Sequence, residues 1–140
     1  MPTSPTSSTE EYKSLIIETA LANGISQPEQ IAYMLATAHH ETGAFKSLTE
    51  NGSDQYLSRY LNYAGNDPTT DDYIVYRGHG FAQLTGKANF DRVGDLLGYD
   101  LVAQPSLAAE PEIAAEILVI GMRDGLFTGY RLDRAINDER

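Results

Sequence analysis

Two glutamates, Glu41 and Glu50, stand nine residues apart in a polar stretch of the chain. Glu41 follows an apolar helical stripe, and Glu50 precedes the turn-forming pair Asn51-Gly52. Two carboxyl groups in different surroundings can divide acid and base work, as the hydrolysis of a glycosidic bond requires. We expect Glu41 to be partly desolvated at the edge of the core and to act as the acid. We expect Glu50 to lie on a more exposed loop, to stay ionised and to hold water.

The same pair also has a structural interpretation. The chain has 20 acidic residues, so two glutamates at this spacing also occur without any shared function. One of them would then cap a helix or form a salt bridge, and the other would be a surface residue. The spacing alone favours this structural interpretation over the catalytic one.

Metal and cofactor sites find little support. His39 and His40 are adjacent, so on a helix they point about 100° apart, whereas a zinc-binding helix places its histidines four residues apart. The acidic stretch "NDPTTDD" lacks the glycine and the final glutamate of an EF-hand. "GHGFAQLTGKA" departs from the spacing of a phosphate-binding loop and lacks its Ser or Thr after the lysine. We expect no metal and no cofactor.

Helices must position these side chains. Apolar spacing, capping boxes and glycine stops predict six of them: from the Ser8–Glu11 box to Asn23, from the Ser26–Glu29 box to Glu41 or Thr42, around Gln55–Tyr60, within 87–98, within 110–125 and over 130–140. "YIVYRGHGFAQLTG" predicts a small β-hairpin or an extended segment. The sequence thus predicts a mainly α domain over residues 8–140, after a flexible tail of residues 1–7.

Composition limits the classes of function. With 41% hydrophobic residues, the chain of 140 residues can bury a core, and the absence of cysteine excludes disulfides. The net charge of −10 disfavours nucleic acid as a partner. No apolar run is long enough to cross a membrane, and the N-terminus lacks the pattern of a signal peptide. We expect a monomer that does not insert into membranes and, if it acts outside the cytoplasm, needs another route of release.

Four segments occur in the order of a known family: "AYMLATAHHETGAF", "TENGSDQYLSRY", "YRGHGFAQLTGKANF" and "LVAQPSLAAEPEIAAEILVIGMRDGLFTG". Over residues 26–130 the chain resembles the phage endolysins related to family 19 chitinases, within the lysozyme-like superfamily. The resemblance implies a two-lobed helical domain with a cleft for sugars. It also implies cleavage of β-1,4 bonds in peptidoglycan or chitin, with inversion and without a cofactor.

The resemblance assigns roles by position. Glu41 matches the general acid, and Glu50 matches the second acidic residue. Gln83 and Asn89 match sugar-binding residues, and Thr85 matches the hydroxyl residue that places the attacking water. Without the resemblance, Thr85 would be a helix cap and Asn89 a solvated helical position. Four aromatic residues are candidates for stacking on sugar rings: Tyr56, Tyr60, Tyr76 and Phe81.

Two departures from the family pattern affect the prediction. The family has an arginine between the glycines where this chain has His79, so the residue that grips substrate is expected to titrate near neutral pH. The chain also ends soon after "GLFTG", so the last helix is expected to be shortened. We predict a peptidoglycan-cleaving endolysin of a phage or bacterium that acts on the cell wall. The alternatives are a chitinase, a lytic transglycosylase, and a weakly active wall-binding or virion structural module.

Overall fold

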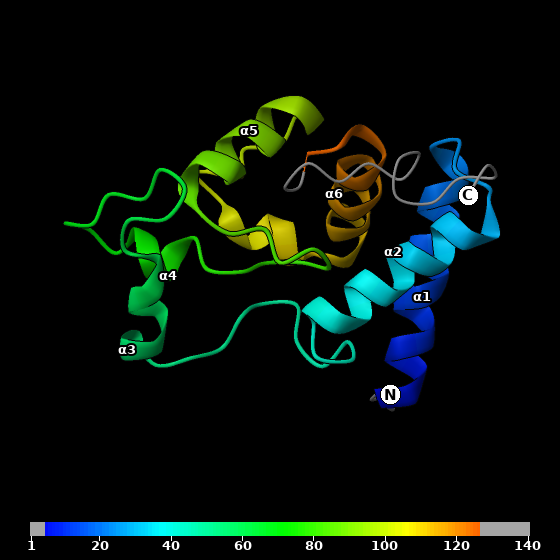
Figure 1. Cartoon of the computed structure of the whole chain (residues 1–140), viewed down its shortest axis with the longest axis horizontal. Coiled ribbons are helices and arrows are strands. Elements are labelled where there is room, and N and C mark those ends of the chain that lie inside the picture. The colour runs from blue at the N-terminus through cyan, green and yellow to red at the C-terminus, as the bar shows by residue number, and fades with distance from the viewer. Residues whose placement is uncertain (1–4, 127–140) are drawn as a thin grey trace.

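The computed structural model describes residues 5–126, and most of them are helical (Figure 1). The elements in order are α1 (Pro5–Ala22), α2 (Pro28–Glu41), α3 (Asp54–Leu57), η1 (Ser58–Tyr60), α4 (Asp72–Val75), α5 (Lys87–Leu97), η2 (Pro105–Ala109) and α6 (Pro111–Asp124). The predicted mainly α class is confirmed. The helix predicted over 130–140 lies outside the described residues.

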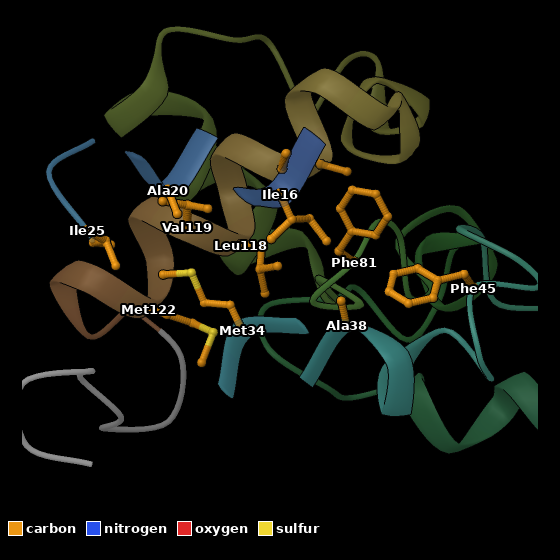
Figure 2. Packing of buried hydrophobic residues seen from close by; sticks show 12 residues of the cluster. Ile16, Ala20, Ile25, Met34, Ala38, Phe45, Phe81, Leu118, Val119 and Met122 are labelled. Atoms are coloured by element: carbon orange, nitrogen blue, oxygen red, sulfur yellow. The ribbon is translucent and has the colours of Figure 1, made fainter. Parts of the chain in front are cut away.

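Helices α1, α2 and α6 pack on one another and enclose the first of two groups of buried side chains (Figures 1 and 2). Ile16 of α1, Met34 of α2 and Leu118 of α6 are fully buried there. Each such side chain contributes roughly 1.5–3 kcal/mol to folding. Phe45 and Phe81 extend this core beyond the helices, with ring centroids 6.0 Å apart. The apolar stripes predicted for these three helices are confirmed.

A second group of buried side chains lies around α5 and η2 and shares α6 with the first. Phe90 and Val93 of α5 are fully buried, and Ile117 of α6 packs with them. Leu96 of the same helix is 54% exposed, so the apolar side chains of α5 are not all buried. The two groups on either side of α6 are the two lobes that the sequence predicted.

The start of the chain differs from the prediction. Helix α1 begins at Pro5, so residues 5–7 are helical rather than part of a flexible tail, and the predicted capping box at Ser8 lies inside the helix. Proline is compatible with the first turn of a helix because its missing N–H has no partner there. Residues 1–4 lie outside the described part of the chain.

The predicted β-hairpin is reduced to isolated bridges. His79 pairs with Leu84 through two backbone hydrogen bonds of 3.0 and 2.9 Å, and it also bridges to Thr49. Within residues 5–126 there are only these isolated bridges and no β-strand. Residues 73–75, predicted as part of the extended segment, lie instead in the one-turn helix α4. The result is a tight turn at 79–84 that is fastened to the chain segment just before Glu50.

Candidate active site

A cavity of about 560 Å³ opens between α2 and the segment from the 79–84 turn into α5. Its walls combine residues of both lobes. They are Tyr33, Ala36, Thr37, His40 and Glu41 of α2, then Tyr63, then Ala82, Gln83, Leu84 and Thr85, then Asn89 and Arg92 of α5, and finally Met122 and Leu126. Four of the residues predicted to do chemistry or bind sugar therefore face one space: Glu41, Gln83, Thr85 and Asn89.

Glu41 is the last residue of α2 and stands at the cavity wall. The chain turns sharply behind it, because the Thr42 hydroxyl donates to the Ala38 carbonyl oxygen at 2.6 Å and accepts from the Phe45 N–H at 2.8 Å. Phe45 adopts a positive φ of 64° and is buried in the first core, which fixes the turn. The Glu41 side chain is exposed, so the prediction of partial desolvation is wrong.

Glu50 is half-buried rather than on an exposed loop. Its Oε2 accepts hydrogen bonds from the hydroxyls of Tyr56 at 3.1 Å and Tyr60 at 3.0 Å, and its Oε1 accepts from the Gly78 N–H at 3.0 Å. Its backbone is also held, since its N–H donates to the Gly78 carbonyl at 2.7 Å and its carbonyl accepts from Arg77 Nε at 2.9 Å. Three donors on one carboxyl group suit an acceptor-only carboxylate.

Glu50 does not line the cavity itself but lies beside the wall that Gln83 forms. A side-chain carbon added at Gly78 would lie 2.5 Å from Gln83 Oε1 and 3.2 Å from Glu50 Oε1, so both oxygens flank this glycine. Gln83 is fixed by its own amide N–H, which donates to the Gly80 carbonyl at 2.8 Å. The Glu50 carboxylate therefore lies near the side chain of Gln83, a residue that lines the cavity.

Thr85 and Asn89 are held in the wall by local hydrogen bonds. The Thr85 hydroxyl donates to the Gln83 carbonyl at 2.8 Å, and Asn89 Nδ2 donates to the Thr85 carbonyl at 2.8 Å. Gly86, with φ 93°, is the N-cap of α5, and no side chain caps the helix, so Thr85 is not the cap considered from the sequence. The Asn89 Oδ1 meets only a long contact of 3.4 Å from Arg92.

The structure corrects the sugar-binding roles predicted for Tyr76, His79 and Phe81. The Tyr76 ring packs on Phe90 and its hydroxyl donates to the Val102 carbonyl at 2.8 Å. His79 is 5% exposed, lies edge-on to the Phe90 ring, and hydrogen-bonds through Nδ1 to the Arg77 carbonyl. Phe81 is fully buried in the first core. All three side chains point into packed cores, so none of them lines the cavity.

Burial also changes the chemistry of His79. Removal from water lowers the pKa of its imidazole, and this effect outweighs the hydrogen bond to the Arg77 carbonyl, which raises it. The neutral ring then carries its proton on Nδ1, which donates to that carbonyl. His79 is a structural residue at the start of the 79–84 turn rather than a titrating residue that binds substrate.

Several cavity residues escaped the sequence analysis, among them Tyr33, Thr37 and Tyr63. Tyr33 precedes Glu41 by eight residues on α2, and Thr37 by four, so helical spacing backwards from Glu41 could have identified this face. Tyr63, 47% exposed, lies in a turn-rich segment with no periodicity to place it.

No group of three His, Cys, Asp or Glu side chains within residues 5–126 is arranged to hold a metal. No helix in that range has the length and hydropathy of a membrane span.

No protein-family model matches the chain. Among curated proteins, it is similar to Chitinase 8 and Chitinase 11 of Oryza sativa subsp. japonica, with 33% identity over 92 residues and 31% over 87 residues. Each match covers 62% of this chain but only 31% and 32% of the two chitinases. The chain thus spans about one third of the length of these curated relatives.

Solved structures show the same fold. Chitinase C from Streptomyces griseus HUT6037 aligns with a TM-score of 0.59 and 21% identity, over 81% of this chain and 64% of that chain. A structure of a chitinase C mutant aligns with a TM-score of 0.55 and 21% identity, over 81% of this chain and 53% of that one. The predicted lysozyme-like helical fold is therefore confirmed.

Proposed function

We propose that the chain is a glycoside hydrolase that cleaves β-1,4 bonds in polysaccharides of N-acetylated amino sugars. The observation that carries the proposal is the cavity that gathers the Glu41 carboxyl with the hydrogen-bonding side chains of Gln83, Thr85 and Asn89. Amide and hydroxyl groups can donate to and accept from sugar hydroxyls. The similarity to two chitinases supports the same reaction class.

In the proposed reaction Glu41 donates its proton to the glycosidic oxygen as the bond from that oxygen to the anomeric carbon breaks. Glu50 accepts a proton from a water whose oxygen forms the new bond to the anomeric carbon, and solvent returns that proton to Glu41. A sugar chain in the cavity would displace water from around the exposed Glu41 carboxyl. Attack of water from the opposite face gives inversion.

Chitin-type polymers are the substrate class we place first. The curated relatives are named chitinases. The chain's net charge of −10 also opposes binding to an anionic cell wall but not to a neutral polymer. Peptidoglycan is the second candidate, favoured by the four endolysin-like segments of residues 26–130. Release from a phage-infected or bacterial cell and a monomeric state remain predictions that belong to this second candidate.

Release of reducing ends from colloidal chitin and from purified peptidoglycan tests the proposal. We expect the wild type to act on chitin and Glu41→Gln to lose at least about a hundredfold in rate, as for a general acid. Glu29→Gln replaces an exposed residue in the first turn of the same helix and should keep the wild-type rate of hydrolysis. A wild type as inactive as Glu41→Gln would support a binding module, and anhydro-sugar ends would identify a transglycosylase. NMR of the first products checks inversion.

A further inference from the structure

Three tyrosines form a row that links the cavity to Glu50. Tyr63 lines the cavity, and its ring centroid lies 5.7 Å from that of Tyr60. The Tyr60 hydroxyl donates to Glu50 Oε2 at 3.0 Å, and Tyr56 donates to the same oxygen at 3.1 Å. The row thus begins at an exposed aromatic face and ends at the carboxylate proposed to activate water.

We propose that Tyr63 is a sugar-stacking residue and that Tyr60 is a positioning residue that holds Glu50 for its attack on water. This inference rests on the proposed function, because Glu50 needs such positioning only in a glycosidase. The exposed ring of Tyr63 offers an apolar surface to the C–H face of a sugar, as aromatic side chains at binding sites do. Because the rings of Tyr63 and Tyr60 are neighbours, a sugar stacked on Tyr63 lies next to the residue that orients Glu50.

The acceptor positions of Glu50 show what the positioning achieves. An ionised carboxylate has about four lone-pair positions. Tyr56 and Tyr60 occupy both on Oε2, whereas Oε1 receives only the Gly78 N–H, so one position on Oε1 is left. Oε1 is also the oxygen that lies beside Gln83 Oε1 and the cavity wall. The tyrosines therefore hold one oxygen away from the reaction and leave the other to accept a proton from water.

The row is anchored to the helix that forms the opposite part of the wall. The buried Asn66 side chain donates to the Tyr60 carbonyl at 2.9 Å and accepts from the Lys87 N–H at 2.7 Å. The Ala88 N–H donates to the Ala64 carbonyl at 2.8 Å. Tyr60 is thus tied to the first turn of α5, which also carries Asn89 at the cavity. A rigid support of this kind is what precise placement of a reacting group needs.

Several charged or titratable groups surround Glu50. They are Tyr56 of α3, Arg59 and Tyr60 of η1, and Arg77 and His79 of the segment after α4. The Arg59 guanidinium lies over the Tyr56 ring, 4.8 Å from its centroid. Burial and the hydrogen bond to Glu50 raise the pKa of Tyr60 to about 12. Its hydroxyl therefore keeps its proton and donates to Glu50 throughout the pH range of an activity assay.

Tyr60→Phe tests the positioning role, and Tyr99→Phe is its matched control. The Tyr99 hydroxyl also donates to a glutamate, Glu116 Oε1, at 3.0 Å, but neither residue lines the cavity. On a chitin oligosaccharide, Tyr60→Phe should lower kcat about tenfold with KM within about twofold.

Tyr99→Phe should keep the wild-type kcat and KM. The inference on Tyr60 is overturned if Tyr60→Phe and Tyr99→Phe have equal kcat values while the wild type is active. An inactive wild type, by contrast, overturns the proposed function and with it the role of Glu50. Thermal unfolding of both variants shows whether a loss of kcat comes from loss of the fold.

The stacking role of Tyr63 is tested by a binding measurement, which does not depend on catalysis. Calorimetry with a chitin oligosaccharide should show about tenfold weaker binding by Tyr63→Ala, because the stacking surface is gone. Tyr63→Phe keeps the ring and should bind as the wild type does. Equal affinity of the wild type and Tyr63→Ala, or weak binding by both Tyr63 variants, would contradict stacking.

Discussion

At the residue scale, the burial of His79 makes a prediction about pH. The folded-state pKa of His79 is lowered by burial, so the unfolded chain takes up a proton at a higher pH than the folded chain. The stability that His79 contributes is therefore present above the ordinary histidine pKa of about 6.5 and is lost as the pH falls below it. We expect the melting temperature to fall between pH 7.5 and pH 5, and to fall less in His79→Leu.

The control for this effect is His39→Gln, since His39 is exposed on α2. Its melting temperature should follow the wild type at both pH values, because the His39 side chain is exposed rather than buried in a core. If His79→Leu and His39→Gln show the same pH dependence as the wild type, His79 is not the group that titrates. Differential scanning calorimetry at the two pH values gives the comparison directly.

The residue scale is also where the sequence analysis was partly right. Glu41 was located by the pattern of its helix, whereas Gln83, Thr85 and Asn89 were assigned by the family resemblance, and the four residues share one cavity. The environments of the two glutamates were interchanged, because burial is set by contacts distant in sequence. Glu50 is half-buried by Tyr56, Tyr60 and Gly78, and no local pattern showed that these residues converge on it.

At the scale of the elements, the 79–84 turn depends on Gly80. Its φ is 86°, and an added side-chain carbon would lie 2.4 Å from the Ala108 carbonyl oxygen. Gly24, after α1, has a similar φ of 82° but has no atom within 4 Å of the same position. Gly24→Ala should therefore cost about 1 kcal/mol of unfolding free energy, from backbone strain alone.

Gly80→Ala should cost about 3 kcal/mol or more, since the turn must also move away from η2. Urea unfolding of the two variants separates strain from crowding. Equal losses of unfolding free energy would mean that the turn shifts freely and that the fit against Ala108 does not matter. Because Gln83 lies in this turn, Gly80→Ala should also weaken the binding of oligosaccharides.

The long helices and the short helix around Gln55–Tyr60 were predictable from the sequence, but α4 and η2 were not. The apolar stripes of α2 and α6 located them within a residue or two, and Gly98 and Gly125 end α5 and α6 with positive φ as predicted. Helix α4 has one turn, and its aromatic and β-branched residues favour an extended form. It packs against α3 and η1, so tertiary contacts decide its structure against the local preference.

At the scale of the whole molecule, net charge separates the two substrate classes. The chain carries −10, so an anionic cell wall repels it at low ionic strength, whereas a neutral chitin polymer does not. Salt shortens the screening length from about 30 Å at 0.01 M to about 10 Å at 0.1 M. Raising the salt over this range should therefore speed the cleavage of peptidoglycan several-fold and change the cleavage of chitin less than about twofold.

The salt series is measured as initial rates on both polymers, with Glu29→Gln as a variant that reduces the negative charge without touching the cavity. That variant should show a slightly smaller salt effect on peptidoglycan and none on chitin. Rates on peptidoglycan that fall with added salt would mean that a local basic surface, rather than net charge, governs the encounter. Arg92, the one Lys or Arg among the cavity-lining residues of the described chain, would then be the first residue to replace.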